Sequence, residues 1–249
     1  MNNISIIIPI LNEADTIETL LTHLLKNSSQ ELISEIIVVD GGSNDGSLDI
    51  VSTFVSGRVQ SRPIKNISTS LEETQIICVN SEKGRAKQMN VGAKQASGNI
   101  LYFLHADSIP PKDFDQAIID EIKKGNQAGC FKMEFNSHHW WLKITGWLTQ
   151  FNWRVCRGGD QSLFITKKLF QKIGGFNESY MVYEDNILIN ALYNRNQFVV
   201  IKKTLKTSAR LYQKHSIWKL QYHFIIIHLK NWFGASAEEL YIYYLKHIT

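Results

Sequence analysis

Acidic side chains follow two of the apolar runs in this sequence. Asp40 comes directly after the run 36–39, and Asp107 follows the run 100–104. A carboxylate in such a position could accept a hydrogen bond from a ligand, bind a divalent cation through its oxygens, or cap the turn that follows it. Glycines after Asp40 would let a flat ring approach the backbone closely. The sequence alone leaves these alternatives open.

A second set of polar residues precedes a predicted helix. Lys83, Gly84 and Arg85 come just before a helix expected over 85–95. Cations beside a helix N-terminus suit a diphosphate, because backbone N–H groups, the helix dipole and a guanidinium all favour negative charge there. The alternative is a solvated basic face on a surface helix. Spacing alone favours the alternative.

An acidic pair, Glu184 and Asp185, stands at the start of a third predicted helix. A carboxylate can take the proton from a hydroxyl as that hydroxyl attacks an electrophile. Acidic residues are also common in the first turn of any helix, because they complement its dipole. The pair is therefore a candidate general base or an ordinary helix start.

The elements that must position these side chains alternate along the first half of the chain. Short apolar runs at 4–10, 36–39, 76–79 and 100–104 predict buried strands, and helical spacing follows the first three. This order predicts an α/β fold with a mainly parallel central sheet and helices on both faces. Ligands of such sheets bind at the carboxyl ends of the strands, where Asp40 and Asp107 lie.

The second half is less regular. We expect helices over about 113–124, 140–151 and 184–195, strands over 129–135 and 198–201, and helical structure from about 216 to the end. The segment 57–75 has no clear period. We expect two units, a domain over 1–210 and a helical extension over 211–249 that packs on it.

Composition excludes several classes of protein. The chain has 249 residues, 44% hydrophobic and 20% charged, with a formal charge of +4. This composition is globular, and the charge is too small and too scattered to predict a nucleic-acid partner. The three cysteines form no C-x-x-C pair, so a disulfide framework is not expected. With no apolar run long enough to span a bilayer and no signal-peptide pattern, we expect a cytoplasmic protein.

The ordered set of motifs resembles family 2 glycosyltransferases of the GT-A fold over roughly residues 4–200. The motifs are the strand ends at 8–13, 38–43 and 103–107, the Gly-Gly-Phe turn at 174–176 and the acidic pair at 184–185. The segments 84–90, 159–161 and 207–210 are similar to a small bacterial branch assigned to arsenosugar biosynthesis, also described as radical-SAM/selenodomain-associated transferases.

The resemblance implies a nucleotide-sugar donor, expected to be a UDP-sugar, and assigns residues to it. The expected donor-binding residues are Pro9, Asn12, Glu13, Asp40, Gly42, Lys83, Gly84, Arg85 and Asp107. His105-Ala106-Asp107 stands where the family usually has Asp-x-Asp, so Asp107 is the expected ligand of Mn²⁺ or Mg²⁺. His105 is a second candidate ligand, and it could equally bind a phosphate or simply pack.

On the acceptor side, the resemblance makes Asp185 the catalytic base of a single displacement that inverts the anomeric carbon. Glu184, Gly159 and Asp160 are expected near the acceptor hydroxyl. Two alternatives remain: membrane-associated transfer to a polyprenyl phosphate or envelope-glycan acceptor, and a non-catalytic protein that binds nucleotide sugars. The sequence names neither the acceptor nor the oligomeric state.

Aromatic residues gather in the second half of the chain, where they could pack in the core, contact an acceptor or contact a membrane. For His138, His139, Trp140 and Trp141 we expect a helix that buries its tryptophans, with an acceptor lip or a peripheral membrane contact as the alternative. For the run 240–245 we expect a helix docked on the core.

Overall fold

The computed structural model describes residues 2–60, 74–158 and 161–248. Its elements are β1 (Ile4–Ile10), α1 (Ala14–Asn27), β2 (Ile33–Asp40), α2 (Ser47–Gln60), β3 (Gln75–Asn80), α3 (Arg85–Gln95), β4 (Ile100–Phe103), β5 (Ser108–Ile109), α4 (Phe114–Lys123), β6 (Ala128–Phe135), α5 (Trp140–Leu148), a 3₁₀ turn η1 (Arg154–Cys156), β7 (Leu163–Thr166), α6 (Lys167–Ile173), α7 (Glu184–Tyr193), β8 (Val199–Thr207), α8 (Arg210–Lys214), α9 (Ile217–Trp232) and α10 (Ala237–His247).

The strands form one sheet in the order β3-β2-β1-β4-β7-β6-β8-β5. The first four strands of that order run parallel, as predicted. β7 then pairs antiparallel with both β4 and β6, β8 runs parallel to β6, and the short β5 pairs antiparallel with β8. The predicted α/β class is confirmed, and the antiparallel β7 is the main departure from a parallel sheet.

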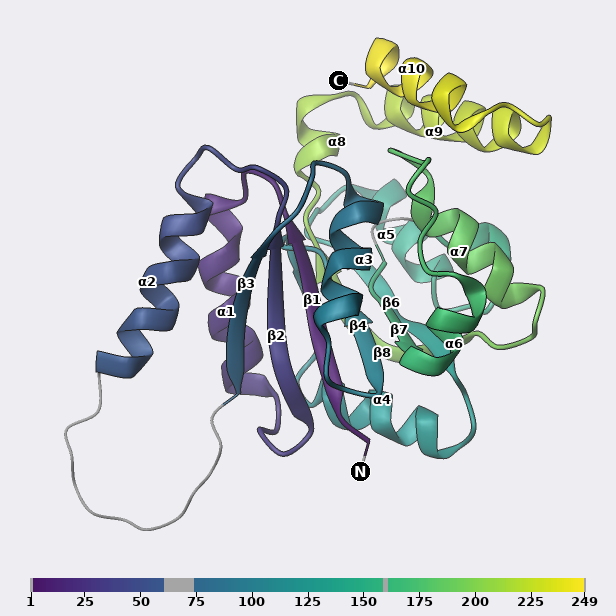
Figure 1. Ribbon diagram of the computed structural model, residues 1–249. Helices are drawn as coiled ribbons and strands as arrows, with labels where there is room; N and C mark the ends of the chain where they lie inside the picture. The colour runs from purple at the N-terminus through teal and green to yellow at the C-terminus, as the bar shows by residue number, and fades with distance from the viewer. Residues whose placement is uncertain (1, 61–73, 159–160, 249) are drawn as a thin grey trace.

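Helices cover both faces of the sheet (Figure 1). Side chains alternate along a strand, so β1 sends Ile6 and Ile8 into one core and Ile7 into the other. The first core also holds residues of α1 and α4, and the second holds residues of α3, α6 and α7. Because both faces are covered, the central strands are mostly apolar, which is why they appear in the sequence as nearly continuous runs.

The end of the chain forms a third, smaller core. Leu220 and Ile227 of α9 pack with Leu240 of α10 and Ile248, against partly buried residues that include Tyr183. In Figure 1, α9 and α10 lie together at one end of the molecule, beyond the carboxyl ends of β1 and β2. The docked helix expected at 240–245 therefore buries Leu240, although Ile242 and Leu245 of the same helix are exposed. The division at residue 210 stays a prediction.

The helix predicted over 140–151 is present as α5, but it buries its tryptophans only in part. Trp140 and Trp147 are more than half exposed, and Leu142 and Gly146 supply the buried side of the helix. Trp141 is half-buried against the first core, so the prediction of buried tryptophans is confirmed in part for Trp141 and is wrong for Trp140. Gly146 lets α5 approach the backbone of Met133 in β6.

Candidate active site

Most of the predicted site residues follow the carboxyl ends of neighbouring parallel strands. Asp40 is the last residue of β2, and its register partners are Ile10 at the end of β1 and Asn80 at the end of β3. Asn12 and Glu13 follow β1, and His105 and Asp107 follow β4, which also pairs with β1. Because these strands are parallel, the side chains gather at one edge of the sheet.

Asp40 holds the turn that follows it. Its carboxylate, which is buried, accepts hydrogen bonds from the backbone N–H groups of Gly42 (2.8 Å) and Ser43 (3.1 Å). Gly42 has a φ of 96°, a left-handed conformation that glycine adopts without strain. The turn-capping alternative is thus the arrangement observed, and contact between Asp40 and a nucleobase stays a prediction.

The loops after β1 and β2 are joined by polar contacts. The backbone N–H of Asn12 donates to Ser43 Oγ (2.9 Å), and Asn12 Oδ1 accepts from the N–H of Asn44 (2.9 Å). The N–H of Glu13 donates to Ser47 Oγ (2.8 Å). Pro9, another predicted donor-side residue, lies within β1 opposite Val39 and is half-buried. These hydrogen bonds join the two loops into one wall at the edge of the sheet.

Arg210 joins this wall to the loop after β4. Its Nη2 atom lies 2.6 Å from Glu13 Oε1 and 2.8 Å from Glu13 Oε2, and 3.3 Å from Asp107 Oδ2. These carboxylates hold the pKa of Arg210 above its usual value, chiefly through the hydrogen bonds to Glu13. Arg210 ends the segment 207–210, but it is not among the predicted site residues. Its partner Glu13 is 197 residues away, so no local pattern could have indicated the pair.

A second arginine joins α3 to α7. Arg85, the first residue of α3, places Nη1 3.4 Å from Glu184 Oε1 and 3.6 Å from Asp185 Oδ2. Both carboxylates are buried in the first turn of α7, whereas about half of the Arg85 side chain is exposed. The predicted diphosphate-binding cation and the predicted base therefore lie in one cluster.

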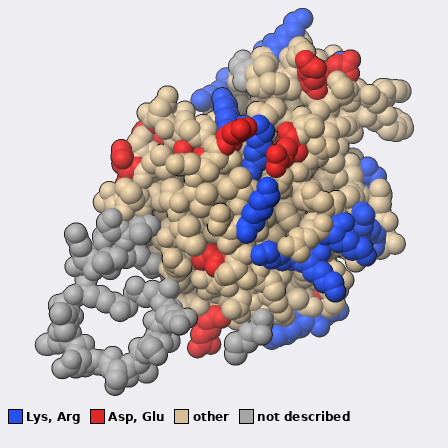
Figure 2. Space-filling model, in the orientation of Figure 1, with Lys and Arg blue, Asp and Glu red and all other residues tan. Residues whose placement is uncertain are grey.

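Gly84 and Lys83 complete the N-terminal end of α3. Gly84 is the N-cap residue with a φ of 138°, and a Cβ there would come within 3.3 Å of the Met181 sulfur. Lys83 is exposed. In Figure 2, basic and acidic side chains lie next to one another around this end of α3.

α3 also connects the Arg85 cluster to the sheet edge. Gln88, one turn after Arg85, is buried and donates from Nε2 to the carbonyl oxygens of Ile10 (2.7 Å) and Val39 (2.8 Å). The first carbonyl belongs to the last residue of β1, and the second belongs to the residue before Asp40. The N-terminus of α3 is therefore fixed beside the ends of β1 and β2.

The side chains at 105–107 suit a divalent cation that is bound jointly by the protein and the substrate phosphates. Asp107 is partly exposed and offers a hard carboxylate oxygen, and Mg²⁺ or Mn²⁺ in such sites binds one or two carboxylates and the substrate phosphates. No group of three or more His, Cys, Asp or Glu residues suited to a metal ion occurs within the described ranges, which leave out 61–73 and 159–160. His105 is half-buried. The predicted residues Gly159 and Asp160 lie outside the described residues.

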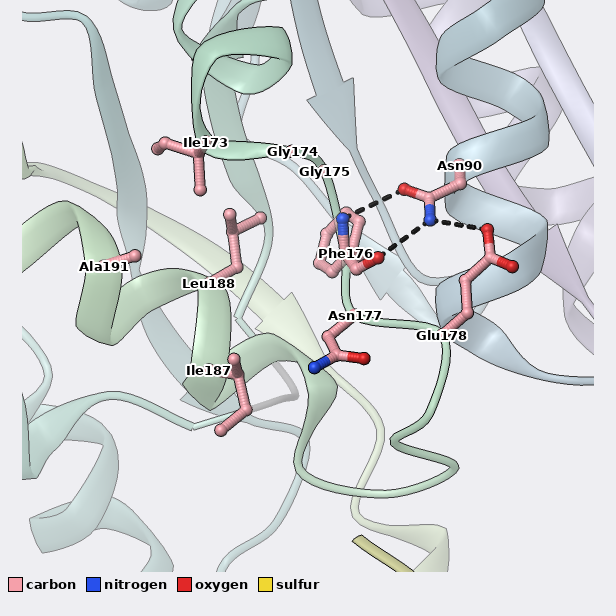
Figure 3. Close-up of a pocket in the computed structure, with 10 residues that line it drawn as sticks. All are labelled: Asn90, Ile173, Gly174, Gly175, Phe176, Asn177, Glu178, Ile187, Leu188 and Ala191. Atoms are coloured by element: carbon pink, nitrogen blue, oxygen red, sulfur yellow. Dashed lines mark hydrogen bonds between the residues drawn. The ribbon is translucent and has the colours of Figure 1, made fainter.

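A separate cavity of about 530 Å³ is lined by residues of α3, of α7 and of the turn that follows α6. Figure 3 shows the amide of Asn90 meeting this turn. Its Oδ1 accepts from Phe176 N–H (3.0 Å), and its Nδ2 donates to Phe176 O (2.9 Å) and Glu178 Oε1 (2.8 Å). The described residues that line this cavity include none of the predicted site residues. Asn90 instead anchors the segment that leads into Glu184 and Asp185.

Comparison with known proteins identifies the family. The model of the family "Glycosyl transferase family 2" matches residues 5–183. The chain belongs to this family. The predicted family is confirmed; the arsenosugar branch stays a prediction.

Two curated relatives show how far the similarity extends. The chain is 30% identical over 186 residues to a PGL/p-HBAD biosynthesis glycosyltransferase of Mycobacterium bovis, covering 73% of this chain and 66% of that protein. It is 32% identical over 107 residues to the glycosyltransferase AglE of Haloferax volcanii, covering 43% and 31%. The chain thus spans about one third to two thirds of the length of these relatives.

Solved structures share the fold. S. aureus TarS 1–349 in complex with UDP superposes with a TM-score of 0.65 at 19% identity, covering 83% of this chain and 60% of that one. Mannosyltransferase PcManGT from Pyrobaculum calidifontis, in complex with GDP-Man and Mn²⁺, gives 0.64 at 17% identity, covering 91% and 62%. These likenesses establish the fold of this family 2 chain, which is the GT-A fold that the sequence predicts.

Proposed function

We propose that this family 2 chain transfers a sugar from a nucleotide-sugar donor, expected to be a UDP-sugar, to a hydroxyl acceptor. The observation that carries the proposal is the pair of arginine–carboxylate clusters at one edge of the sheet. Arg210 contacts Glu13 and Asp107, and Arg85 contacts Glu184 and Asp185. A leaving nucleotide diphosphate needs positive charge, and an attacking hydroxyl needs a base.

In this proposal the donor lies along the ends of β1, β2 and β4. The hydrogen-bonded loops after β1 and β2, residues 12–13 and 43–47, hold the nucleoside. Arg85 and Lys83 stabilise the negative charge on the diphosphate. A bound divalent cation supplies Lewis-acid stabilisation of the departing diphosphate. Asp107 would hold that cation, with His105 as the candidate second ligand.

Asp185 is the proposed base. Its carboxylate is buried in the first turn of α7, where the helix N-terminus stabilises negative charge. The acceptor oxygen forms a bond to the anomeric carbon, the bond to the diphosphate oxygen breaks, and the hydroxyl proton goes to Asp185. One base and one leaving group imply a single displacement with inversion. Glu184, beside it, orients Arg85.

The first experiment identifies the donor. Thermal denaturation with UDP or GDP, each with and without Mn²⁺, should show stabilisation by UDP with Mn²⁺, because a ligand that binds the folded state raises its stability. Indifference to every nucleotide diphosphate would overturn the proposal. Binding of a nucleotide sugar without any hydrolysis or transfer would favour the non-catalytic alternative.

The second experiment tests the base. Asp185→Asn should lower the transfer rate by at least about 100-fold while the Kd for UDP changes little, because general-base catalysis contributes roughly 10²–10⁴-fold. Glu238→Gln on α10 is the matched control, an exposed carboxylate far from the cluster in sequence. Loss of UDP binding in Asp185→Asn would instead assign Asp185 a structural role.

Two classes of acceptor are proposed. The first is a small molecule of arsenosugar formation, which the branch resemblance suggests. A second candidate is a polyprenyl phosphate or envelope-glycan acceptor at a membrane. The exposed tryptophans of α5 and α9 favour that candidate, because tryptophan is enriched at membrane interfaces.

A further inference from the structure

The solvent-facing side of α9 is apolar. Its most exposed large residues are spaced by four, three, four and three, which places them on one face of the helix. They are Trp218, Tyr222, Ile225, Leu229 and Trp232, and Phe233 follows at the C-cap. Trp232 and Phe233 are 79% and 83% exposed. A surface helix normally presents polar residues on this side.

The opposite side of α9 is already occupied. Leu220, His223 and Ile227 are buried. The side chains of Leu220 and Ile227 belong to the third core, together with Leu240 of α10. The exposed stripe is therefore distinct from the side of α9 that packs on α10. It is a second apolar face, whose five side chains are between 38% and 79% exposed.

α5 extends this face. Trp140, Ile144 and Trp147 are exposed and lie on one side of α5. The Trp218 ring lies 6.0 Å from the Trp140 ring and 5.2 Å from the Trp141 ring, so the two stripes meet at this cluster. We call the exposed apolar residues of α5 and α9 together the aromatic face.

The two helices that carry the aromatic face have basic side chains and no acidic ones. Residues 186–237, which include α8 and α9, contain no Asp or Glu, and neither do residues 135–159, which include α5. Lys143, Lys214 and Lys219 are exposed on these helices, and Lys230 lies half-buried over the Tyr243 ring. The nearest acids that follow in sequence, Glu238 and Glu239, begin α10, where Glu239 closes a capping box with Ser236.

We propose that the aromatic face is a docking surface for anionic lipid bilayers. Tryptophan and tyrosine rings prefer the headgroup region, and lysines beside them are attracted to anionic lipids. A second copy of the chain fits less well, because a symmetric contact would bring the lysines of α5 and α9 from both copies together, and neither helix carries an acid. None of the described helices is long and apolar enough to cross a bilayer, so the chain would lie on the surface.

α9 also contacts the candidate active site. The ring of His228 is hydrogen-bonded to the hydroxyl of Tyr183 at 2.8 Å, and Tyr183 is the residue before Glu184 and Asp185. Docking through α9 would therefore hold the acidic cluster near the bilayer surface. Only this step rests on the proposed function; binding to lipid does not require it.

Co-sedimentation with vesicles tests the proposal without any substrate. Vesicles of phosphatidylcholine with phosphatidylglycerol should bind the chain, and vesicles of pure phosphatidylcholine should bind it more weakly. Trp232→Ser with Phe233→Ser should lower the partition coefficient by at least about 10-fold, since both rings leave the interface. Both side chains are exposed, so the variant should fold, which circular dichroism checks.

Charge variants provide the matched comparison. Lys143→Gln with Lys219→Gln, two exposed lysines of α5 and α9, should lower binding to anionic vesicles roughly 25-fold at low salt, because each lysine near such a surface contributes about a factor of five. The control is Lys26→Gln with Lys112→Gln, two exposed lysines at the end of α1 and before α4, on the side of the molecule opposite α9 (Figure 1). The control should bind as the wild type does.

Three outcomes would overturn the proposal. Wild-type protein that does not sediment with anionic vesicles is one, and aromatic variants that bind as tightly as the wild type are another. The third is a wild-type dimer in sedimentation equilibrium that Trp232→Ser with Phe233→Ser converts to a monomer, which would assign the face to a second copy. None of these readouts depends on donor binding or transfer.

Discussion

Nη2 of Arg210 lies 2.6 Å from Oε1 of Glu13, although the two residues are 197 positions apart in the sequence. The pair joins the start of α8 to the loop after β1, and the same guanidinium reaches Asp107 after β4. Two carboxylates that would otherwise repel each other thus share one cation. The family model ends at residue 183, so a residue beyond its match completes the arrangement of the strand-end loops.

Arg210→Ala is expected to destabilise the fold by about 1 kcal/mol, because the Arg210 side chain is partly exposed and such ion pairs contribute little. Its larger effect should be on nucleotide binding and transfer, since Glu13 and Asp107 lose their shared cation. Arg210→Lys should recover the stability and only part of the activity, as an ammonium group cannot reproduce the guanidinium geometry. Urea denaturation and UDP titration measure the two effects.

Arg195→Ala is the matched control for Arg210. Arg195 follows the end of α7; its guanidinium donates to the carbonyl of Ala191 in that helix and is exposed. The control should leave both stability and UDP binding close to wild type. If Arg210→Ala behaves like Arg195→Ala, the contacts with Glu13 and Asp107 have no energetic role.

Asn90→Ala should loosen the segment that leads to the acidic pair. The Asn90 amide makes three hydrogen bonds to Phe176 and Glu178, and losing them would leave backbone groups of Phe176 without these partners. We expect a loss of about 1–3 kcal/mol in the free energy of unfolding and a lower kcat. Lys94→Ala, an exposed residue of the same helix, controls for helix propensity. Wild-type kcat in Asn90→Ala would show that this anchor does not position the site.

The parallel part of the sheet was predictable because its signal is local. β1 to β4 are short apolar runs followed by polar residues, and burial of both sheet faces makes such runs continuous. α6 was missed because seven residues carry little periodicity, and β8 was predicted only over 198–201 because Lys202, Lys203 and Lys206 break its apolar pattern. The site residues could be placed at strand ends from sequence. The pairing of Arg85 with Glu184 and of Arg210 with Glu13 depends on tertiary structure, which no spacing encodes.

The two cysteines of the sheet should differ in reactivity. Cys130 is buried in β6, and burial raises the pKa of its thiol to about 11 despite the nearby Arg157. Cys78 of β3 is exposed, and partial burial and the charge of Asp40 raise the pKa of its thiol by less. Because the thiolate is the reactive form, a thiol reagent at pH 8 should modify Cys78 and leave Cys130 intact until the protein unfolds.

Mass spectrometry of the labelled protein checks this difference. Cys78→Ser should remove the faster of these two reactions, and Cys130 should become reactive only in denaturant. The rate at Cys78 should rise between pH 7 and pH 9, since its pKa lies above the ordinary value. Labelling of Cys130 in the folded protein at the rate of Cys78 would contradict the buried position of β6.

The packing of α9 on α10 should weaken in mild acid because of His223. This residue is buried, its Nδ1 lies 2.8 Å from the Tyr243 hydroxyl oxygen, and its ring stacks on that of His247 at 4.9 Å. Burial first, and then the charges of His247 and Lys219, lower the pKa of His223 below its ordinary value. A histidine with a lowered folded pKa stays neutral where the unfolded chain already binds a proton. Its contribution to stability is therefore complete above about pH 6.5 and is lost as the pH falls towards the folded pKa.

Amide hydrogen exchange of α9 and α10, after correction for the intrinsic pH dependence, should show less protection at pH 5 than at pH 7.5. His223→Gln should reduce this pH dependence, because glutamine can still bond to Tyr243 but does not titrate. His215→Gln, a histidine that precedes α9, serves as the control and should retain the wild-type slope. An unchanged slope in His223→Gln would mean that another group controls the response, and His247, stacked on the same ring, would be the next to replace.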